Sequence, residues 1–399
     1  MIFYNDSEVI SRCGIIKHMM MVKNKKIFTS IAMLVGMIIG VGIFGVPFAL
    51  SQSGFVAGIF YFTILGVSIV FVHLFYGETV LRTNGQHRLV GYAEKYLGMW
   101  GRRIAAVTEI FGFYGSMIAY IVIGGEFLFS LIKIGDVFVY QVFVFLVVAI
   151  FILLGLRLLS RVEFILTSAL LISVVTILFI ASPVARLDNF FAFDVKNLFL
   201  PYGVILFSLG GSAAIPEIKE VLRGNLKKMK GVLIAGSLIA ILITAAFGFL
   251  MWGVSGDRTS EETLAGLQGI LSQPVLTLGA VFGFLSIITS FLVIGINLKE
   301  IFFYDYNLKN NILTWALAVF VPFLIFLSGS RTFIEIISIT GALFGGMGGI
   351  LICLMYLRAK KIGDKKPEYV LRIPSIIPYS IIAIFTVGIF YEIFYLFFA

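Results

Sequence analysis

The chain has 399 residues, of which 60% are apolar and only 13% are Asp, Glu, Lys or Arg. Soluble domains average about 45–50% apolar and about 25% charged residues, so this composition excludes a water-soluble protein and predicts one solvated by lipid. Two cysteines, Cys13 and Cys353, exclude a disulfide framework, and no cysteine or histidine spacing indicates a metal site. The net charge of +9 does not indicate a nucleic-acid partner, because Lys and Arg form short clusters between apolar runs.

Apolar runs long enough to cross a bilayer, which takes about 20 residues, recur along the whole chain. They predict an all-α integral membrane protein with eleven spans at 27–51, 55–77, 103–132, 137–156, 162–182, 198–218, 231–253, 274–303, 312–328, 332–357 and 374–398. With a cytoplasmic N-terminus, 25 of the 30 Lys and Arg residues fall in inner segments and 5 in outer ones. The positive-inside rule therefore predicts a multi-pass protein of the cell membrane, with residues 1–26 in the cytoplasm and the C-terminus outside.

The first predicted span is interrupted near its middle. It reads GMIIGVGIFGVPFAL and contains Gly36, Gly40, Gly42, Gly45 and Pro47. In a helix interior each Gly costs about 1 kcal/mol and Pro about 3 kcal/mol, so helix 1 should unwind here. Unpaired backbone at this depth costs several kcal/mol per group, so the break must line a protein or water cavity, and a ligand is its natural partner.

Helix 6 repeats this interruption. In SLGGSAAIPEI, Gly210 and Gly211 precede Pro216, and aligning Pro47 with Pro216 places Gly42 on Gly211. One such helix is typical of close packing, but two in register favour function. An odd number of spans separates their starts, so the halves are inverted, and matching broken helices in inverted halves indicate a transporter binding site. We expect a first repeat at 27–182, a second at 198–357 and an extra helix at 374–398.

Three further segments carry weaker signals. The glycine-rich stretch 341–349 of helix 10 contains no Pro, which favours close packing or a gating hinge. Residues 82–103 predict a short cytoplasmic helix. Residues 260–273 predict an outer helix that begins at Ser260 and serves as a lid or as a plain connector.

The pieces GVGIFGVPFALSQSG, SLGGSAAIPEI and ITSFLVIGINLKEIFFYDY resemble the corresponding pieces of the amino acid/auxin permeases and the related aromatic amino acid permeases. These belong to the amino acid, polyamine and organocation superfamily, and the likeness covers nearly the whole chain in helix order. The resemblance implies a leucine-transporter-like fold: a five-plus-five inverted repeat with discontinuous helices 1 and 6, plus one extra C-terminal helix. It also implies secondary active transport of amino acids.

The broken helices suit a zwitterion, because a free helix end exposes amides at its N-terminus and carbonyls at its C-terminus. We expect the second half of helix 1 to begin near Gly42, so that nearby amides hold the substrate carboxylate. Carbonyls that end the first half of helix 6 would face its ammonium group, as the resemblance also implies. The candidate substrate-binding residues are Gly40, Val41, Gly42, Ile43, Ile205, Leu206, Ser208, Gly210, Gly211 and Tyr114.

Specificity for a large side chain is indicated by Gly211, which leaves room after the SLG of helix 6. Tyr114 and Tyr120 of helix 3 offer rings and hydroxyls to an aromatic substrate. Taken singly, each tyrosine is more typical of ordinary helix packing, since 15% of the chain is aromatic.

Two coupling ions, sodium and the proton, remain open. Ser286, Thr289 and Ser290 of helix 8, with the carbonyls of Gly36 and Ile39, resemble a sodium site of this fold, although Ser and Thr in membrane helices usually bond their own backbone.

A proton carrier needs a titratable group inside the bundle. The candidates are Glu109, Glu126, His73 and Glu78, each assigned to a span end, where a solvated role is commoner.

Other function classes have less support. An intramembrane enzyme would need a nucleophile and base that the three histidines do not provide, and a metal carrier would need Asp, Asn, Met or His at the breaks. We therefore predict a non-enzymatic importer of neutral amino acids, aromatic ones included, by cation-coupled symport, with no cofactor and no known protein partner. The alternatives are an uncoupled exchanger, or a carrier of metal or another small solute on the same fold.

Overall fold

The structure is a computed structural model, and it describes residues 25–85, 87–155, 160–191, 197–329 and 332–398. It is built of helices, which satisfy their own backbone groups as a chain surrounded by lipid requires. In chain order they are Lys25–Ile38, α2 (Val46–Ser53), α3 (Phe55–Arg82), α4 (Leu89–Ile132), α5 (Val137–Leu153), α6 (Ser160–Ala181), α7 (Leu200–Ser208), α8 (Ile215–Val221), α9 (Met229–Ser255), α10 (Gln273–Glu300), α11 (Asn311–Leu327), α12 (Phe333–Ile339), α13 (Gly346–Ile362) and α14 (Ile376–Phe398).

Within the part of the chain that the structure describes, six helical stretches are long and apolar enough to cross a membrane. A seventh qualifies when Lys25–Ile38 and Val41–Ser53, which meet at an angle of 51°, are taken as one broken span. Three shorter apolar helices of 10–17 residues lie among the described residues. The expected all-helical architecture is confirmed, whereas the count of eleven spans and the inverted repeat stay predictions.

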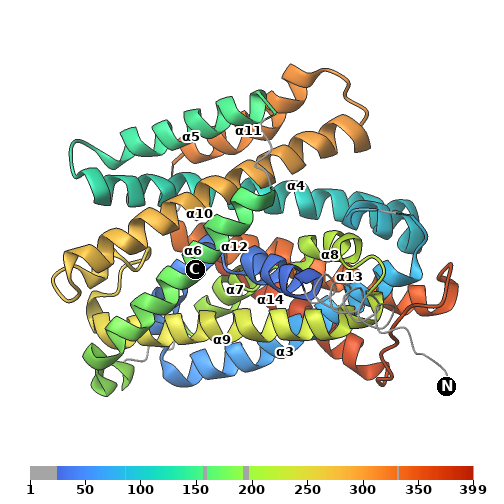
Figure 1. The fold of residues 1–399 in the computed structure, drawn as a ribbon, viewed down its shortest axis with the longest axis horizontal. Helices are drawn as coiled ribbons and strands as arrows, with labels where there is room; N and C mark the ends of the chain where they lie inside the picture. The colour runs from blue at the N-terminus through green and yellow to red at the C-terminus, as the bar shows by residue number, and fades with distance from the viewer. Residues whose placement is uncertain (1–24, 86, 156–159, 192–196, 330–331, 399) are drawn as a thin grey trace, which may run out of the picture.

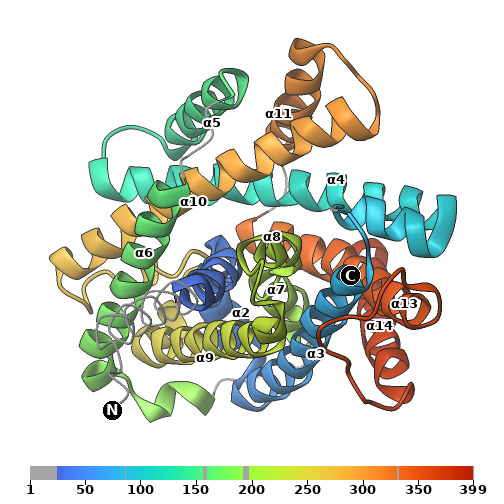
Figure 2. The same ribbon diagram turned by 45° about the vertical axis from the view of Figure 1, so that its right-hand side comes forward.

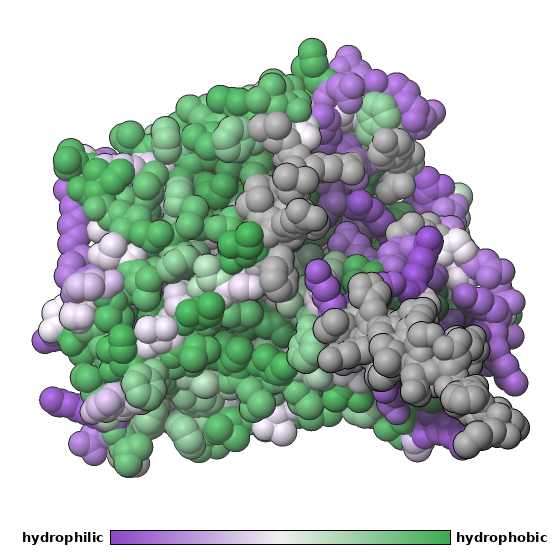
Figure 3. Space-filling model, viewed as in Figure 1, coloured by the Kyte–Doolittle hydropathy of each residue, from purple (hydrophilic) through white to green (hydrophobic). Residues whose placement is uncertain are grey.

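The helices form layers around a central group of broken elements. Figures 1 and 2 show α5 and α11 on one side of α4 and α10, with α3 and α9 on the opposite side. The short helices α2, α7 and α8 lie between these layers, and α2 contacts both α7 and α9. In Figure 3 apolar residues form a broad band across the molecule and hydrophilic residues gather at its two ends, as expected for a chain that spans a bilayer.

Glycines let several of these helices pack closely. A Cβ atom on Gly341 would collide with the backbone of Gly203 in α7, and one on Gly349 would collide with the ring of Phe385 in α14. Gly341 lies in η10 (Thr340–Gly345), a π-helical turn between α12 and α13. The close packing expected for the glycine-rich stretch of helix 10 is therefore confirmed.

The two polar connections differ from each other. The short helix expected over 82–103 is the first part of α4, set off from the rest by Gly98, whose φ of 73° is not helical. The helix expected over 260–273 is wrong, because Thr263 and Gly269 have φ of 68° and 78°, values that an α-helix excludes. That segment holds one 3-10 turn, η8 (Ala265–Leu267).

The α13–α14 linker (residues 363–373) is tied to the end of α3. The carboxylate of Glu78 accepts hydrogen bonds from the guanidinium of Arg82 and from the amide of Leu371, both at 2.7 Å. The hydroxyl of Tyr369 donates to a carbonyl of α3 at 2.7 Å. Glu78 is fully buried, so the solvated role expected for it is wrong: the linker covers this end of α3.

Candidate functional site

The predicted break in helix 1 is present. The first helix ends at Ile38, and Gly40 is extended, with φ of −120° and ψ of −150°. Because Gly40 leaves the helical conformation, the amides of Val41 and Gly42 have no backbone acceptor among the described residues. The amide of Ile43 bonds the carbonyl of Gly40 at 3.4 Å. Two of the three predicted amides are therefore free to meet a carboxylate.

The second half of helix 1 begins later than expected. A 3-10 turn, η1 (Val41–Phe44), follows the extended residue, and α2 begins only at Val46. Pro47 lies in the first turn of α2, where a missing amide donor leaves no helical carbonyl unpaired. The expected helix start near Gly42 is wrong by four residues, because the proline selects its own turn as the start.

The predicted break in helix 6 is present as well, between Ser208 and α8. The amide of Gly210 bonds the carbonyl of Phe207 at 3.2 Å instead of the carbonyl of Leu206, which a continuous helix would use. The carbonyl of Ile205 accepts the amide of Leu209, so it is already satisfied. Of the three predicted carbonyls, those of Leu206 and Ser208 are the ones left at the free end.

The two breaks lie against each other. A Cβ atom on Gly42 would lie 2.7 Å from Ser208 Oγ and 2.8 Å from Ser208 Cα. On the other side, a Cβ atom on Gly211 would collide with Ile38. The small size of Gly211 therefore serves the contact between helices 1 and 6, and not room for a substrate side chain as expected. The amide-bearing turn of helix 1 faces the carbonyl end of α7.

One side of this junction is covered. The ring of Phe44 packs edge-on against Phe127 of α4, with ring centroids 4.8 Å apart, and the hydroxyl of Thr263 donates to the carbonyl of Phe44. Gly210 is exposed, and a Cβ atom on Gly40 would meet nothing within 4 Å among the residues that the structure describes. Open space therefore adjoins the junction at Gly40 and Gly210.

The two tyrosines proposed from the sequence have partners of their own. Tyr114 is buried, and its hydroxyl donates to the carbonyl of Leu317 in α11 at 2.9 Å. Tyr120 is buried, and its ring packs against that of Phe291 in α10, with ring centroids 5.9 Å apart. Contact of Tyr114 with a substrate, which stays a prediction, would involve its ring, because the hydroxyl is already bonded.

One of the expected sodium ligands of α10 has a local partner. Thr289 Oγ1 donates to the carbonyl of Ser286 at 2.8 Å. The amide that would bond the carbonyl of Gly36 in a continuous helix, that of Gly40, bonds Ile38 instead. The carbonyl of Gly36 therefore lacks the amide partner that it would have in a continuous helix. Its role as a sodium ligand stays a prediction.

Two buried ionisable residues were placed wrongly or missed. His73 was expected at a solvated span end, yet it is 1% exposed, and its Nδ1 lies 2.8 Å from Ser237 Oγ. Lys219, which no sequence prediction singled out, is buried and donates to three carbonyls at the end of α3, those of Val80, Thr83 and Gly85. Because these contacts join segments more than 130 residues apart, no local sequence signal identifies them. Glu109 and Glu126, the other proton candidates, are half-buried.

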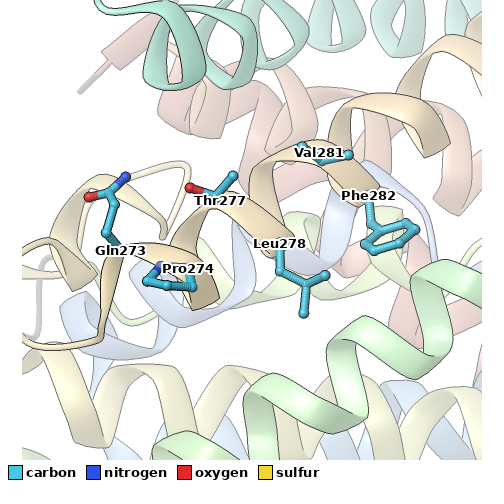
Figure 4. A pocket seen from close by; sticks show the side chains of 6 residues that line it. All are labelled: Gln273, Pro274, Thr277, Leu278, Val281 and Phe282. Carbon is cyan, nitrogen blue, oxygen red and sulfur yellow. The ribbon is translucent and has the colours of Figure 1, made fainter.

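A surface hollow on α10 is separate from this junction. Figure 4 shows that its six lining residues all come from the first part of one helix: Gln273, Pro274, Thr277, Leu278, Val281 and Phe282. None of them belongs to either break. The hollow has no part in the candidate site.

Comparisons with known proteins agree with these features. The sequence model of the tryptophan/tyrosine permease family matches residues 23–394. Tyrosine-specific transport system 1 of Haemophilus influenzae is 25% identical over 360 residues, which are 83% of this chain and 88% of that protein. Tyrosine-specific transport system 2 of the same organism is 25% identical over 347 residues, 81% of this chain and 85% of that protein. The crystal structure of MhsT in complex with L-phenylalanine shares the fold, with a TM-score of 0.62 and 13% identity over 92% of this chain and 97% of that one.

Proposed function

The chain belongs to the tryptophan/tyrosine permease family, and from this premise we propose that it imports an aromatic amino acid by cation-coupled symport. It is a membrane transporter of amino acids and not an enzyme. The choice of an aromatic substrate is supported by the two relatives, whose names state transport specific for tyrosine. The more distant likeness to the amino acid/auxin permeases stays a prediction.

One observation carries the proposal: the turn at Val41 and Gly42 faces the end of α7 at Ser208. In the proposed complex the two amides donate to the substrate carboxylate, and the carbonyls of Leu206 and Ser208 accept from the ammonium group. Peptide dipoles then neutralise both charges of the zwitterion without a charged side chain. The aromatic side chain extends from this junction into the open space beside Gly40 and Gly210.

The transport cycle we propose alternates which side of the junction is covered. With the N-terminus in the cytoplasm, as the charge distribution predicts, the side covered by Phe44 and Thr263 faces outward and the exposed side faces the cytoplasm. The conformation described is then an inward-facing one. Outward opening would separate the rings of Phe44 and Phe127 and break the hydrogen bond from Thr263.

Uphill uptake requires a second ligand whose gradient supplies the work. One elementary charge that crosses 100 mV provides about 2.3 kcal/mol, which corresponds to roughly fiftyfold accumulation. An uncoupled exchanger is the alternative, and it would equilibrate substrate without accumulating it.

The test uses the full chain in lipid vesicles with a membrane potential and a pH gradient. Uptake of labelled tyrosine is measured in competition with each of the twenty amino acids. We expect tyrosine, tryptophan and phenylalanine to compete far better than aliphatic or charged amino acids. Equal competition by small aliphatic amino acids, or no tyrosine uptake at all, would overturn the aromatic assignment.

A further inference from the structure

We infer that His73, paired with Ser237, is the residue that binds the coupling proton. This inference rests on the proposed symport function and names the ion and its site. The geometry points to it because the pair connects α3 and α9 in the buried interior, one side chain away from the broken helices.

His73 lies in the interior of α3. It comes nine residues before the last residue of this helix, which corresponds to about 14 Å along the helix axis. Its neighbours on the same face are Gly66, which faces Ile241 of α9, and Gly77, which faces Leu233. His73 therefore interrupts an otherwise apolar contact between α3 and α9. An ionisable side chain at such a position is costly and rare unless it has a function.

Ser237 is a partner suited to both protonation states of the imidazole. When His73 is neutral with Nδ1 unprotonated, the hydroxyl of Ser237 donates to Nδ1 over the 2.8 Å distance. When a proton is added to the ring, Nδ1–H donates and the hydroxyl oxygen accepts. The hydrogen bond survives proton binding and release, and only the net charge at this position changes.

A contact path joins this pair to the substrate site. Gly236, the neighbour of Ser237, abuts Leu34 in the first half of helix 1, and Leu34 in turn abuts Gly211 at the helix 6 break. A positive charge at His73 disfavours a dry interface between α3 and α9. Because Leu34 packs against Gly236, the residue of α9 next to Ser237, a shift of α9 driven by the protonation state of His73 biases the position of helix 1, and this links the proton to the substrate.

The other ionisable groups around α3 have partners elsewhere. Glu78, about 7.5 Å further along the helix axis, is bonded to Arg82 and to the linker. Lys219 of α8 is bonded to carbonyls at the end of α3. The remaining titratable groups on elements packed against α3, in α7, α8, α9, α13 and the linker, are Tyr202, Glu217, Glu220, Lys230, Cys353, Tyr356, Arg358, Lys360, Lys361, Asp364, Lys365, Lys366, Glu368, Tyr369 and Arg372.

Among the described residues, the alternative ion has a weaker site. Thr289, an expected sodium ligand of α10, donates to the carbonyl of Ser286, and its oxygen would also have to face the carbonyls of helix 1 to bind sodium. His73 and Ser237 are already in hydrogen-bond contact, 2.8 Å apart, in the conformation described.

The test separates coupling from transport in lipid vesicles that hold the full chain. Substrate counterflow, the exchange of labelled for unlabelled tyrosine without any ion gradient, reports the transport cycle alone. Accumulation under 100 mV and proton influx, followed by a pH dye inside the vesicles, report coupling. The variants are His73→Asn, His73→Gln and Ser237→Ala, with His87→Asn as a matched control outside the spans.

We expect the unaltered chain and His87→Asn to accumulate tyrosine roughly fiftyfold at 100 mV and to show substrate-dependent proton influx. In His73→Asn and His73→Gln we expect accumulation to fall to about onefold and proton influx to vanish, while counterflow continues. Retained proton influx in these variants, or loss of counterflow together with accumulation in both, would overturn the proton assignment. Absence of counterflow in the unaltered chain would instead refute the proposed transport function itself.

Discussion

Replacing Gly42 by alanine should destabilise the junction of the two breaks. The new methyl carbon would lie 2.8 Å from Ser208 Cα, whereas carbon atoms in favourable contact are about 3.5–4.0 Å apart. The breaks must therefore separate by about 0.7–1.2 Å, because backbone cannot rotate away as a long side chain can. Overpacking of this kind costs about 1–3 kcal/mol. If this cost falls on the tyrosine-bound state and not on the free protein, the affinity for tyrosine falls by roughly 5- to 140-fold.

The measurement is the melting temperature of the purified protein in detergent, followed by the binding affinity for tyrosine. Gly40→Ala is the matched control for melting, because it lies in the same break and its methyl group would meet nothing within 4 Å. We expect Gly42→Ala to melt at a lower temperature than Gly40→Ala and to bind tyrosine more weakly than the unaltered chain. Identical melting of the two variants, with unaltered tyrosine binding by Gly42→Ala, would show that the breaks do not touch as described.

Three further substitutions test contacts far from the sequence motifs. Glu78→Ala leaves the half-buried Arg82 and the buried amide of Leu371 unpaired, so we expect a loss of about 1–3 kcal/mol in unfolding free energy, against about 0–1 kcal/mol for the exposed pair in Glu94→Ala; equal losses would refute the buried linkage. Thr263→Val removes the donor to the covered side of the junction and should lower stability by about 1–3 kcal/mol, while Thr263→Ser retains it, and indistinguishable melting of the two would count against that hydrogen bond. Lys219→Met should lower the melting temperature well below that of Lys230→Met, since of these two lysines only Lys219 is buried and bonded to α3. Equal melting temperatures of the two variants would contradict the hydrogen bonds from Lys219 to the end of α3.

The sequence predicts the parts of the site that depend on local chemistry. Glycine and proline act on their own turn of helix, so both breaks were placed correctly from Gly40 and Pro216. The start of α2 was predicted too early, because the same residues can form either a 3-10 turn or the first turn of an α-helix. Similarly, Thr263 and Gly269 adopt left-handed backbone angles that the polar composition of the outer segment does not reveal.

Contacts between distant segments could not be predicted from one sequence. The burial of Glu78 depends on the linker almost 300 residues later, and that of His73 on the packing of α9. Distance to a predicted span end is therefore a poor measure of solvation when another segment covers that end. The face of Gly211 was likewise misassigned, since its neighbour Ile38 belongs to a different helix.

The linkage of Glu78 to Leu371 has a practical consequence for topology mapping. Topology is often mapped by fusing a reporter enzyme to progressively truncated chains, and this method assumes that each upstream helix inserts correctly without the segments that follow it. A chain truncated before residue 363 would lack the amide of Leu371, which donates a hydrogen bond to the buried carboxylate of Glu78. The predicted orientation, with the C-terminus outside, should accordingly be tested by impermeant thiol labelling of single cysteines introduced into the intact polypeptide.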